Sequence, residues 1–378
     1  MSSSRIKRID FGVLEGQRPR GAGSNARIGE HGLTVRVPLV RLTTSDGVTG
    51  FGRCRASQEQ LQPLVGSQMT DAFDPKKGPA ATWRAYDFPL WDLAAKIAHQ
   101  PVYALAATIV GTSATEPFAV PCYDTSLYFD DLEIEDDSEA AELIAGEARE
   151  GYERGHRAFK IKVGRGGRHM PLEEGTRRDI VVVHAVRAAV GDESKVMLDA
   201  NNGYNLNLTK RVLAETATAN IHWMEEPFHE DIALYEDLRE WLQAQGLTVL
   251  IADGEGLASS ALLDWARAGA IDVVQYDIFS HGFSGWLETG TQLDAWGVQT
   301  APHHYGGHYG NYAAPHLAAA VKNFAFAEWD EVTIPGIETP DYVVQEGQVH
   351  IPPSPGFGLE LDEARFARAV ETGGFSLE

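Results

Sequence analysis

The first third of the chain changes from a strand-like to a helix-like spacing of apolar residues. Within residues 33–43, apolar side chains occupy alternate positions from Leu33 to Leu39, which predicts a half-buried strand. Asp46-Gly47, a pair typical of hairpin turns, separates this strand from a second one at 48–52. Residues 84–106 then follow a helical period. We expect residues 1–117 to form an α+β domain.

Short apolar runs that end in polar residues recur from residue 118 to residue 327. Five of the seven intervals between successive starts are 23 to 27 residues long, close to one strand plus one helix. The runs are Phe118–Cys122, Ala158–Val163, Lys195–Leu198, Ile221–Met224, Thr248–Ala252, Ile271–Gln275, Val298–Ala301 and Phe324–Ala327. They predict an α/β fold in which residues 118–340 form a TIM-like (β/α) barrel of seven or eight strands. Residues 341–378 are expected to pack back on the first domain, which then caps the barrel.

Side chains with catalytic chemistry stand at the carboxyl ends of these predicted strands. In a parallel barrel those ends meet at one mouth, so residues far apart in the sequence come together. The residues are Lys160, Lys162, Asp199, Asn201, Glu225, Glu226, Asp253, Glu255, Asp277, His303 and Glu328. A lone Lys-x-Lys is usually a solvated strand face, but its place in an ordered set of strand ends favours a functional site.

Three carboxylates from adjacent predicted strands, Asp199, Glu225 and Glu255, predict a metal site. Carboxylates packed together raise one another's pKa unless a cation neutralises them. Hard oxygen ligands favour Mg²⁺, one ion per site, which keeps positions open for water or substrate. Asp253 is an alternative third ligand. We expect the substrate to be a small molecule that places a carboxylate on this ion.

Two candidate acid/base groups flank the predicted metal site. Lys160 and Lys162 lie on one side of a strand, and the ion together with the neighbouring ammonium should lower the pKa of Lys162 toward neutrality. A neutral amine there can act as a general base. On the other flank Asp277 and His303 can form a dyad in which the carboxylate orients the imidazole. Lys160 and the metal would stabilise the enediolate formed by loss of the α-proton.

These strand ends resemble the enolase superfamily, mandelate racemase subgroup, over most of the chain. The segment Asp87–Lys96 resembles a helix of that family's capping domain. The resemblance implies the same Mg²⁺ ligands and acid/base pair, a hydrogen bond from Glu328 to the enediolate oxygen, and a homo-oligomer. Asn201 is a candidate substrate-site residue that could reach a metal-bound water. The chain departs from the family pattern at Gly164–Gly175, which we interpret as an added flexible loop.

Arginines of the first domain are candidate substrate-binding groups. Residues 16–32 are rich in Gly and Arg and predict a mobile lid. Arg53 and Arg55 follow the hairpin and could bind a distal carboxylate or hydroxyls, with ordinary solubility as the alternative.

Several histidines near His303 invite a zinc interpretation, which we do not favour because the first predicted barrel strand lacks a His-x-His pair. We expect these residues on the surface or in the substrate pocket: His304, His308 and His316. His281 is expected to line the pocket.

Composition narrows the classes of partner. Lys and Arg number 32 against 54 Asp and Glu, a net charge of −22, which argues against nucleic acid or an anionic membrane as partner. Two cysteines exclude a disulfide framework, and the first residues contain no apolar signal segment. We expect a cytoplasmic protein.

The function expected from these residues is dehydration of an acid sugar, an aldonate or aldarate, to a 2-keto-3-deoxy acid. Lys162 or His303 would remove the α-proton, and protonated His303 would assist loss of the β-hydroxyl. A racemase or epimerase of a 2-hydroxy acid is the nearest alternative, because it needs the same residues. A cycloisomerase and a non-catalytic binder of acidic metabolites remain as further alternatives.

Overall fold

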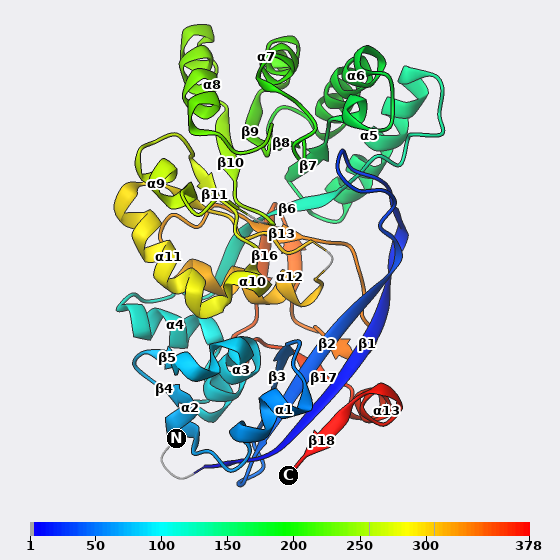
Figure 1. The fold of residues 1–378 in the computed structure, drawn as a ribbon. Helices are drawn as coiled ribbons and strands as arrows, with labels where there is room; N and C mark the ends of the chain where they lie inside the picture. The colour runs from blue at the N-terminus through cyan, green and yellow to red at the C-terminus, as the bar shows by residue number, and fades with distance from the viewer. Residues whose placement is uncertain (1–3, 257, 306) are drawn as a thin grey trace.

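The computed structural model describes residues 4–256, 258–305 and 307–378. Figure 1 shows an N-terminal capping part below and a sheet with outer helices above, and the C-terminal residues return to the lower part beside the N-terminus. Among the described residues, no helix has the length and apolar character needed to cross a membrane.

The capping part is built on an antiparallel sheet in the order β18-β1-β2-β3. Its strands are β1 (Ile6–Ala22), β2 (Gly32–Thr44), β3 (Thr49–Arg53) and β18 (Phe375–Leu377). The predicted alternation holds on β2, where Val37 and Leu39 are fully buried. At the predicted turn Gly47 has φ 87°, a left-handed conformation that glycine adopts without strain, and its N–H donates to Thr44 O (3.0 Å).

Helix α3 (Asp87–Ile97) packs directly on β3. Gly50 and Gly52 allow this close approach, since a Cβ on Gly50 would lie 2.4 Å from the Leu93 backbone. Helix α13 (Glu363–Gly373) covers β1. The remaining capping elements are α1 (Gln58–Leu61), η1 (Gln62–Leu64), α2 (Met69–Ala72), β4 (Phe73–Asp74), β5 (Gly78–Pro79), η2 (Ala81–Tyr86) and α4 (Val102–Val110).

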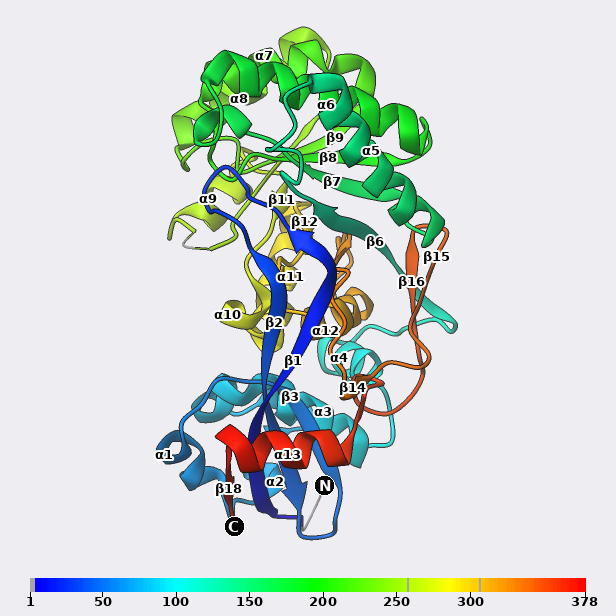
Figure 2. The ribbon, with the colours of Figure 1, turned by 90° about the vertical axis from the view of Figure 1, so that its right-hand side faces the viewer.

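The prediction that residues 16–32 form a mobile lid is wrong for the first part of this segment. Residues 16–22 extend β1 and pair with β2, with Gly16 opposite Val35 and Gln17 opposite Thr34. Figure 2 shows this two-stranded arm leaving the capping part and running up to the level of the large sheet. Beyond β1 the chain is held on the barrel by the Phe129 N–H, which donates to Ser24 O (3.0 Å). A glycine- and arginine-rich sequence hid the strand because both faces of the arm carry few apolar residues.

Eight parallel strands form the large sheet, in the order β12-β11-β10-β9-β8-β7-β6-β13. They are β6 (Phe118–Leu127), β7 (Ala158–Lys162), β8 (Lys195–Asp199), β9 (Ile221–Glu225), β10 (Leu250–Asp253), β11 (Val273–Val274), β12 (Gln299–Thr300) and β13 (Ala327–Trp329). Each lies within or next to a run predicted from the sequence, and their chain order is the predicted one.

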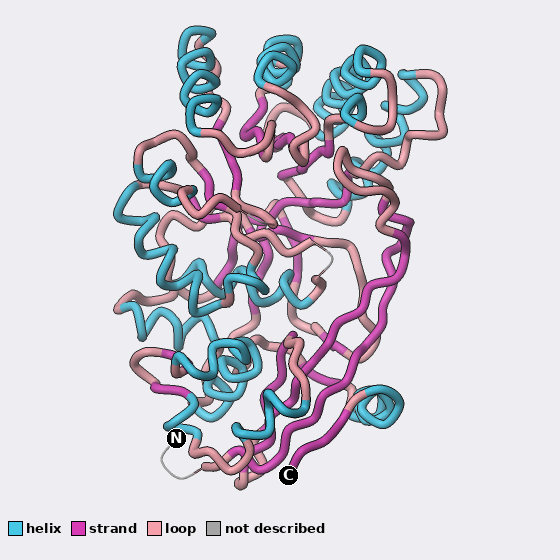
Figure 3. The backbone as a smooth tube through the Cα atoms, in the orientation of Figure 1, coloured by secondary structure: helices cyan, strands magenta, loops and turns pink. Residues whose placement is uncertain are grey.

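Helices follow the strands of this sheet, and Figure 3 shows several of them as cyan coils over its outer face in the upper part of the molecule. In chain order the helices between and after these strands are α5 (Asp137–Glu153), α6 (Leu172–Val190), α7 (Leu206–Glu215), α8 (Ile232–Gln245), α9 (Leu262–Arg267), α10 (Ile278–His281), α11 (Phe283–Trp296) and α12 (Tyr309–Ala313), of which α10, α11 and α12 lie closer to the capping part (Figure 1). Short 3₁₀ turns stand at η3 (Arg165–Gly167), η4 (Ala217–Ala219) and η5 (Ala314–Ala319).

The sheet curves strongly around a buried cluster of its own. This cluster takes one side chain from each of seven successive strands or strand ends: Tyr123, Ala158, Met197, Trp223, Ala252, Val273 and Ala301. The rings of Tyr123 and Trp223, two residues on non-adjacent strands, lie 5.5 Å apart. On the other side, Thr300 forms a parallel bridge with Phe324, shortly before β13. Inward side chains of distant strands therefore share one interior.

The C-terminal residues 341–378 contact both parts of the molecule. Besides α13 and β18 on the capping part, β15 (Val343–Gln345) and β16 (Gln348–Ile351) form a hairpin whose second strand pairs antiparallel with β6. Two further strands pair with each other, β14 (Ile337–Glu338) and β17 (Glu360–Leu361).

Arg20, near the end of β1, joins the arm to the barrel through a cluster of carboxylates. Its guanidinium lies 3.4 Å from Glu147 on α5 and 3.7 Å from Asp130, and it also faces Glu150 (3.3 Å). Burial raises the pKa of Glu147 to about 9, and Asp130 adds to this, although Arg20 acts in the opposite direction. Glu147 therefore keeps its proton in the folded protein at neutral pH.

Replacement of Glu147 by glutamine should make stability less dependent on pH. The raised pKa in the folded state means that unfolding releases a proton above about pH 4.5, so the free energy of unfolding falls as pH rises from about 4.5 to 9. Glu147→Gln removes this loss and should be more stable than the wild type at pH 9 by about 1 kcal/mol or more. Urea unfolding at several pH values measures it. The control Glu150→Gln should keep the wild-type slope, and an unchanged slope in Glu147→Gln would contradict the assignment.

Candidate active site

The carboxyl ends of β8, β9 and β10 bring three carboxylates together. Asp199 and Glu225 end their strands and lie opposite each other in the sheet register, and Glu255 stands two residues beyond β10. One oxygen atom of each lies within 4.8 Å of the others. Asp199 and Glu225 are fully buried. The predicted cluster is thus present as a geometric group.

The cluster has the charge and the free oxygen atoms that a divalent cation requires. Burial and then the neighbouring Asp199 raise the pKa of Glu225 to about 8, the sign of carboxylates that repel one another. Glu255 Oε2 and Asn201 Oδ1 are buried without a hydrogen-bond donor. Oxygen donors of this kind suit Mg²⁺. The three carboxylates therefore fit a single hard cation.

Asn201 and Asp253 occupy different environments. The Asn201 side chain donates to Glu255 Oε1 (3.1 Å) and Glu226 Oε2 (2.9 Å), so it orients the third carboxylate of the cluster. Asp253 instead accepts hydrogen bonds from the Tyr235 hydroxyl and the Gly254 N–H. Both Asp253 oxygens are thereby used outside the cluster. Asp253 and Glu255 were the two candidates for the third metal ligand, and the fold places Glu255 with Asp199 and Glu225.

Two side chains that the sequence analysis did not select orient Glu225. Trp223 Nε1 donates to Glu225 Oε2 (3.1 Å), and Gln275 Nε2 donates to the same oxygen (2.8 Å). These bonds leave Glu225 Oε1 for Lys160 Nζ (2.7 Å). Gln275 precedes Asp277 at the end of a predicted strand, and this strand-end position is the signal that could have identified it.

Both lysines of β7 reach the cluster. Lys160 Nζ also lies 3.4 Å from Glu328 and 3.5 Å from Asp199, while Lys162 Nζ pairs with Asp199. Burial lowers the pKa of Lys162, but Asp199 outweighs it, so that the pKa is raised among the protein groups. This direction is opposite to our expectation, because the expectation included a cation that would share the charge of Asp199.

His303 lies between two carboxylates. Its Nδ1 is 3.3 Å from Asp277 Oδ2, and its Nε2 is 3.2 Å from Glu255 Oε2. Burial lowers the pKa of His303, but Glu255, Glu328 and Asp277 together raise it to about 9. Asp277 is fixed by its other oxygen, which caps α10 by accepting the N–H groups of residues 279 and 280. Asp277 and His303 thus lie together as predicted, and the surrounding carboxylates favour the protonated imidazole.

Glu328 is held in place by three hydrogen-bond donors of the protein. Its Oε1 accepts from Thr125 Oγ1 (2.7 Å), and its Oε2 accepts from the N–H groups of His304 (2.6 Å) and Tyr305 (3.1 Å). Burial raises the pKa of Glu328, but Lys160 and His303 outweigh it and hold this pKa well below its usual value. Glu328 therefore positions Lys160 and the chain after His303, and its hydrogen bond with the enediolate oxygen stays a prediction.

An aromatic group above Lys162 escaped the sequence analysis. The Tyr128 ring lies 5.3 Å from Lys162 Nζ and stacks on Tyr305 (4.7 Å between centroids). His31, from the tip of the arm, packs edge-on against both rings. Arg18 lies over Tyr305, 4.7 Å from its centroid. These residues come from segments far apart in the chain, Arg18 from β1 and the others from loops, so nothing in their local sequence relates them.

The prediction that Gly164–Gly175 is a flexible loop is wrong. Arg165 is fully buried, ion-paired with Asp131 (2.6 Å) and Asp179 (2.8 Å), and it donates to Lys162 O (3.3 Å). Asp179 also accepts from the Gly164 N–H (2.8 Å). These bonds tie the end of β7, which carries Lys162, to α6 and to the segment after β6. From Leu172 onward the chain is already helix α6.

The extra histidines are buried rather than exposed. His304 and His316 are fully buried and His308 is 3% exposed. Each bonds to a neighbouring group: His304 to Glu328 O (2.7 Å), His308 to Tyr312 (3.1 Å) and His316 to Tyr342 (2.8 Å). They hold the segments around β13 together and lie outside the carboxylate cluster. The prediction that they lie on the surface was wrong, and a place in the substrate pocket stays a prediction.

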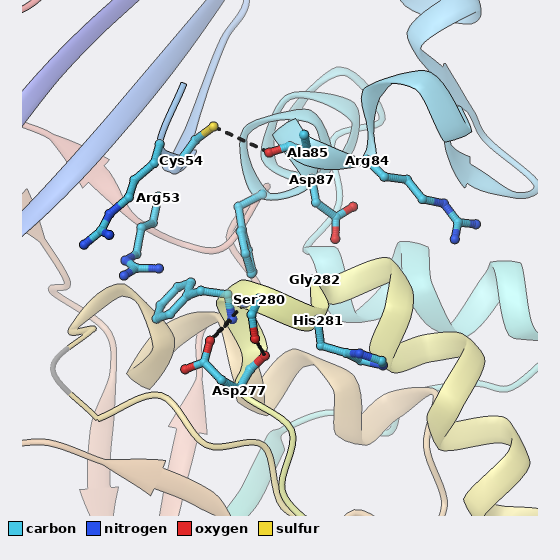
Figure 4. Close-up of a pocket in the computed structure, with 12 residues that line it drawn as sticks. Arg53, Cys54, Arg84, Ala85, Asp87, Asp277, Ser280, His281 and Gly282 are labelled. Carbon is cyan, nitrogen blue, oxygen red and sulfur yellow. Dashed lines mark hydrogen bonds between the residues drawn. The ribbon is translucent and has the colours of Figure 1, made fainter. Parts of the chain in front are cut away.

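Arg53 and Arg55 do not contact the carboxylate cluster. They line a separate cavity of about 630 Å³ whose walls also include Asp277 and His281 (Figure 4). Asp277 is therefore the link between this cavity and the dyad.

Comparison with known proteins shows the family of this chain. A model of the family described as Enolase C-terminal domain-like matches residues 143–365. The chain belongs to the enolase superfamily. Within this superfamily, a galacturonate dehydratase from Geobacillus sp. solved with D-galacturonate and 5-keto-4-deoxy-D-galacturonate is 46% identical, with a TM-score of 0.95 and 100% of each chain covered. A mutant of that enzyme was solved with Mg; its TM-score is 0.96, and the match covers 100% of this chain and 97% of the other.

Relatives of lower sequence identity include a dehydratase and a cycloisomerase. An arabinonate dehydratase of Saccharolobus solfataricus is 28% identical over 370 residues, which cover 88% of this chain and 90% of the relative. A D-galactarolactone cycloisomerase of Agrobacterium fabrum is 29% identical over 365 residues, covering 86% and 88%. The superfamily members similar to this chain thus include both dehydratases and cycloisomerases.

Loss of Glu255 should weaken metal binding far more than loss of Asp253. Glu255→Gln should raise the dissociation constant of Mn²⁺, used as a spectroscopic substitute for Mg²⁺, at least about 100-fold, because even indirect partners of metal ligands contribute 10- to 100-fold. Electron paramagnetic resonance of free Mn²⁺ measures this. Asp253→Asn is the matched control and should bind Mn²⁺ within a few-fold of the wild type. Equal losses in the two variants would rule out this ligand set.

Proposed function

We propose that the protein is a Mg²⁺-dependent carbon–oxygen lyase that dehydrates an acid sugar. The observation that carries the proposal is the buried cluster of Asp199, Glu225 and Glu255, with Lys162 on one flank and His303 on the other. A bound Mg²⁺ would neutralise the three carboxylates and polarise the substrate carboxylate. The dehydratases among the relatives support the same reaction class.

The reaction removes one proton and one hydroxyl from neighbouring carbons. Lys162 takes the proton from the carbon next to the carboxylate. The electron pair of the broken C–H bond then moves toward the carboxylate and forms the enediolate. Protonated His303 gives its proton to the hydroxyl on the next carbon, the C–O bond breaks, and water leaves. The resulting enol takes up a proton at carbon and becomes the 2-keto-3-deoxy acid. A cation held by Asp199 would share the charge of this carboxylate and would lower the pKa of Lys162 toward that of a usable base.

The other site residues stabilise the enediolate or orient the groups that react with the substrate. Lys160, fully buried beside Glu225, places a positive charge where the enediolate gains its second negative charge. Asp277 fixes the tautomer of His303, since its Oδ2 faces Nδ1 and leaves Nε2 for the substrate side. Asn201 orients Glu255. The arm places His31 edge-on against Tyr128, on the Lys162 side of the site.

The substrate that we propose is a hexuronate such as D-galacturonate. The Geobacillus enzyme, 46% identical over the whole chain, was solved with this acid and with its 5-keto-4-deoxy product. For such a substrate the proton leaves C5, next to the carboxylate, and the hydroxyl leaves C4. Cycloisomerisation of a sugar lactone is the second candidate, favoured by the 29% identical relative that carries this activity.

Lys162 and His303 should separate the two proton transfers. In D₂O with Mg²⁺ and D-galacturonate, Lys162→Ala should lose both α-proton exchange and keto-acid formation, at least about 10³-fold. His303→Asn should keep exchange while losing the keto acid by a similar factor. NMR of the C5 proton and derivatisation of the carbonyl measure the two events. Lys195→Ala, an exposed lysine at the opposite end of β8, is the control and should react like the wild type.

Other results of this experiment would contradict parts of the proposal. Exchange retained in Lys162→Ala and lost in His303→Asn would reverse the two roles. Inversion at the α-carbon without a keto acid would mean epimerisation, and ring opening of a lactone would mean cycloisomerisation. No change with any acid of an aldonate, aldarate and uronate panel would leave the chain as a binder.

A further inference from the structure

The barrel closes between β12 and β13 with few backbone hydrogen bonds. Among the described residues, one bridge joins the two segments, between Thr300 and Phe324. It consists of the Thr300 N–H, which donates to Asn323 O (2.9 Å), and the Ala325 N–H, which donates to Thr300 O (2.8 Å). The next donor of this parallel ladder would be residue 302, which is a proline without an N–H. The backbone ladder therefore lacks a donor just before the segment that carries the proposed acid.

Hydrogen bonds between His304 and Glu328 take the place of the missing ladder. The His304 N–H donates to Glu328 Oε2 (2.6 Å), and the ring Nε2 of His304 lies 2.7 Å from Glu328 O. Because a carbonyl oxygen only accepts, the hydrogen of this second bond is on Nε2. The Tyr305 N–H donates to the same carboxylate oxygen (3.1 Å). The segment after β12 is thus bonded to β13 through a ring and a carboxylate.

The His304 ring is fixed by packing as well as by its hydrogen bond. It is fully buried, and a Cβ on Gly310 of α12 would lie 2.4 Å from His304 Cγ, so a larger residue there would displace the ring. Figure 1 shows α12 beside β13. Asn311 of α12 holds the two together, since its amide donates to Asp330 O (2.8 Å) and its oxygen accepts from the Asp330 N–H (3.0 Å). The ring is therefore held between α12 and β13.

The peptide group between His303 and His304 is hydrogen-bonded at both of its ends. Its oxygen, His303 O, accepts from the Ile278 N–H (2.8 Å), and its N–H is the one that donates to Glu328. A planar peptide group held at both ends fixes the direction in which the next side chain leaves the backbone. For His303 this direction leads to Asp277, whose Oδ2 lies 3.3 Å from Nδ1.

We propose that His304 is a positioning residue for the proposed acid, His303: its ring bond to Glu328 O holds the peptide group that aims the imidazole. This proposal rests on the proposed function, because the imidazole gives up a proton only in the dehydration. Loss of the ring bond should leave removal of the α-proton intact. Lys160 (3.4 Å) and Thr125 (2.7 Å) contact the other carboxylate oxygen of Glu328, Oε1, which His304 does not use.

Variants of His304 should separate the two steps of the reaction. His304→Leu removes the donor, and it should slow keto-acid formation from D-galacturonate about 10- to 100-fold, mainly through kcat, because a small displacement of a reacting group costs this much. Exchange of the C5 proton with D₂O should stay within about threefold of the wild type. His304→Gln, which has nearly the size of leucine but keeps an amide N–H that reaches Glu328 O, should restore most of the keto-acid formation.

Two further variants control this comparison. His304→Asn is polar but too short to reach Glu328 O, so it should behave like His304→Leu and replaces that variant if leucine prevents folding. His316→Leu, at a fully buried histidine of η5 that bonds to Tyr342, should leave the ratio of the two rates at the wild-type value. Equal losses of exchange and keto-acid formation in the His304 variants would mean a general structural role and would overturn the proposal.

Crystal structures separate failure of this inference from failure of the proposed function. In His304→Leu or His304→Asn the distance from His303 Nδ1 to Asp277 Oδ2 should exceed about 4 Å, beyond hydrogen-bond range, and in His304→Gln it should return to the wild-type value. An unchanged distance in the first two variants would overturn the inference whatever their activity. If the wild type turns over no acid sugar, the proposed function fails, and this distance still decides whether His304 holds His303.

Discussion

Repulsion among three closely packed carboxylates is the constraint around which the barrel mouth is organised. One oxygen atom of each of Asp199, Glu225 and Glu255 lies within 4.8 Å of the others, the first two residues are buried and the third is partly exposed, and the fold supplies positive charge on both sides of them. Lys160 and Lys162 come from β7, and His303 comes from the segment after β12. Such an arrangement is stable only while the positive groups stay in place. Residues that touch no substrate, such as Arg165 beneath Lys162, matter because they hold those groups.

The same charges explain why the protein groups alone do not determine the protonation states of Lys162 and His303 during the reaction. The carboxylates hold Lys162 and His303 as cations, and one cation added to the cluster changes the balance for Lys162 more than for His303. Lys162 shares Asp199 directly with the proposed ion, whereas His303 keeps a second carboxylate, Asp277, outside the cluster. A base and an acid can thus arise from two groups that begin with the same charge.

The sequence was most informative where a short pattern fixes a long-range geometry. Each polar residue at a strand end could be placed because parallel strands bring their carboxyl ends together, and this gave the cluster of Asp199, Glu225 and Glu255. The orientation of a side chain does not follow from that rule. The hydrogen bonds of Trp223 and Gln275 with Glu225, and those that Glu328 accepts, could therefore be described only from the structure. The same holds for Arg165, whose partners Asp131 and Asp179 come from separate elements. The arm of β1 was missed because its pairing with β2, rather than an apolar pattern, makes it a strand.

The attachment of the chain's last residues has a consequence for how the protein forms on the ribosome. Strand β6, the first of the large sheet, takes its remaining neighbours from β13 and β16, and β1 takes its outer neighbour from β18 at residues 375–377. Both sheets therefore keep an open edge until the residues that pair with them have been made. Pairing across more than 200 residues is slow compared with local helix formation. The nascent chain carries these edges unpaired in the meantime, and an unpaired edge favours association with other chains.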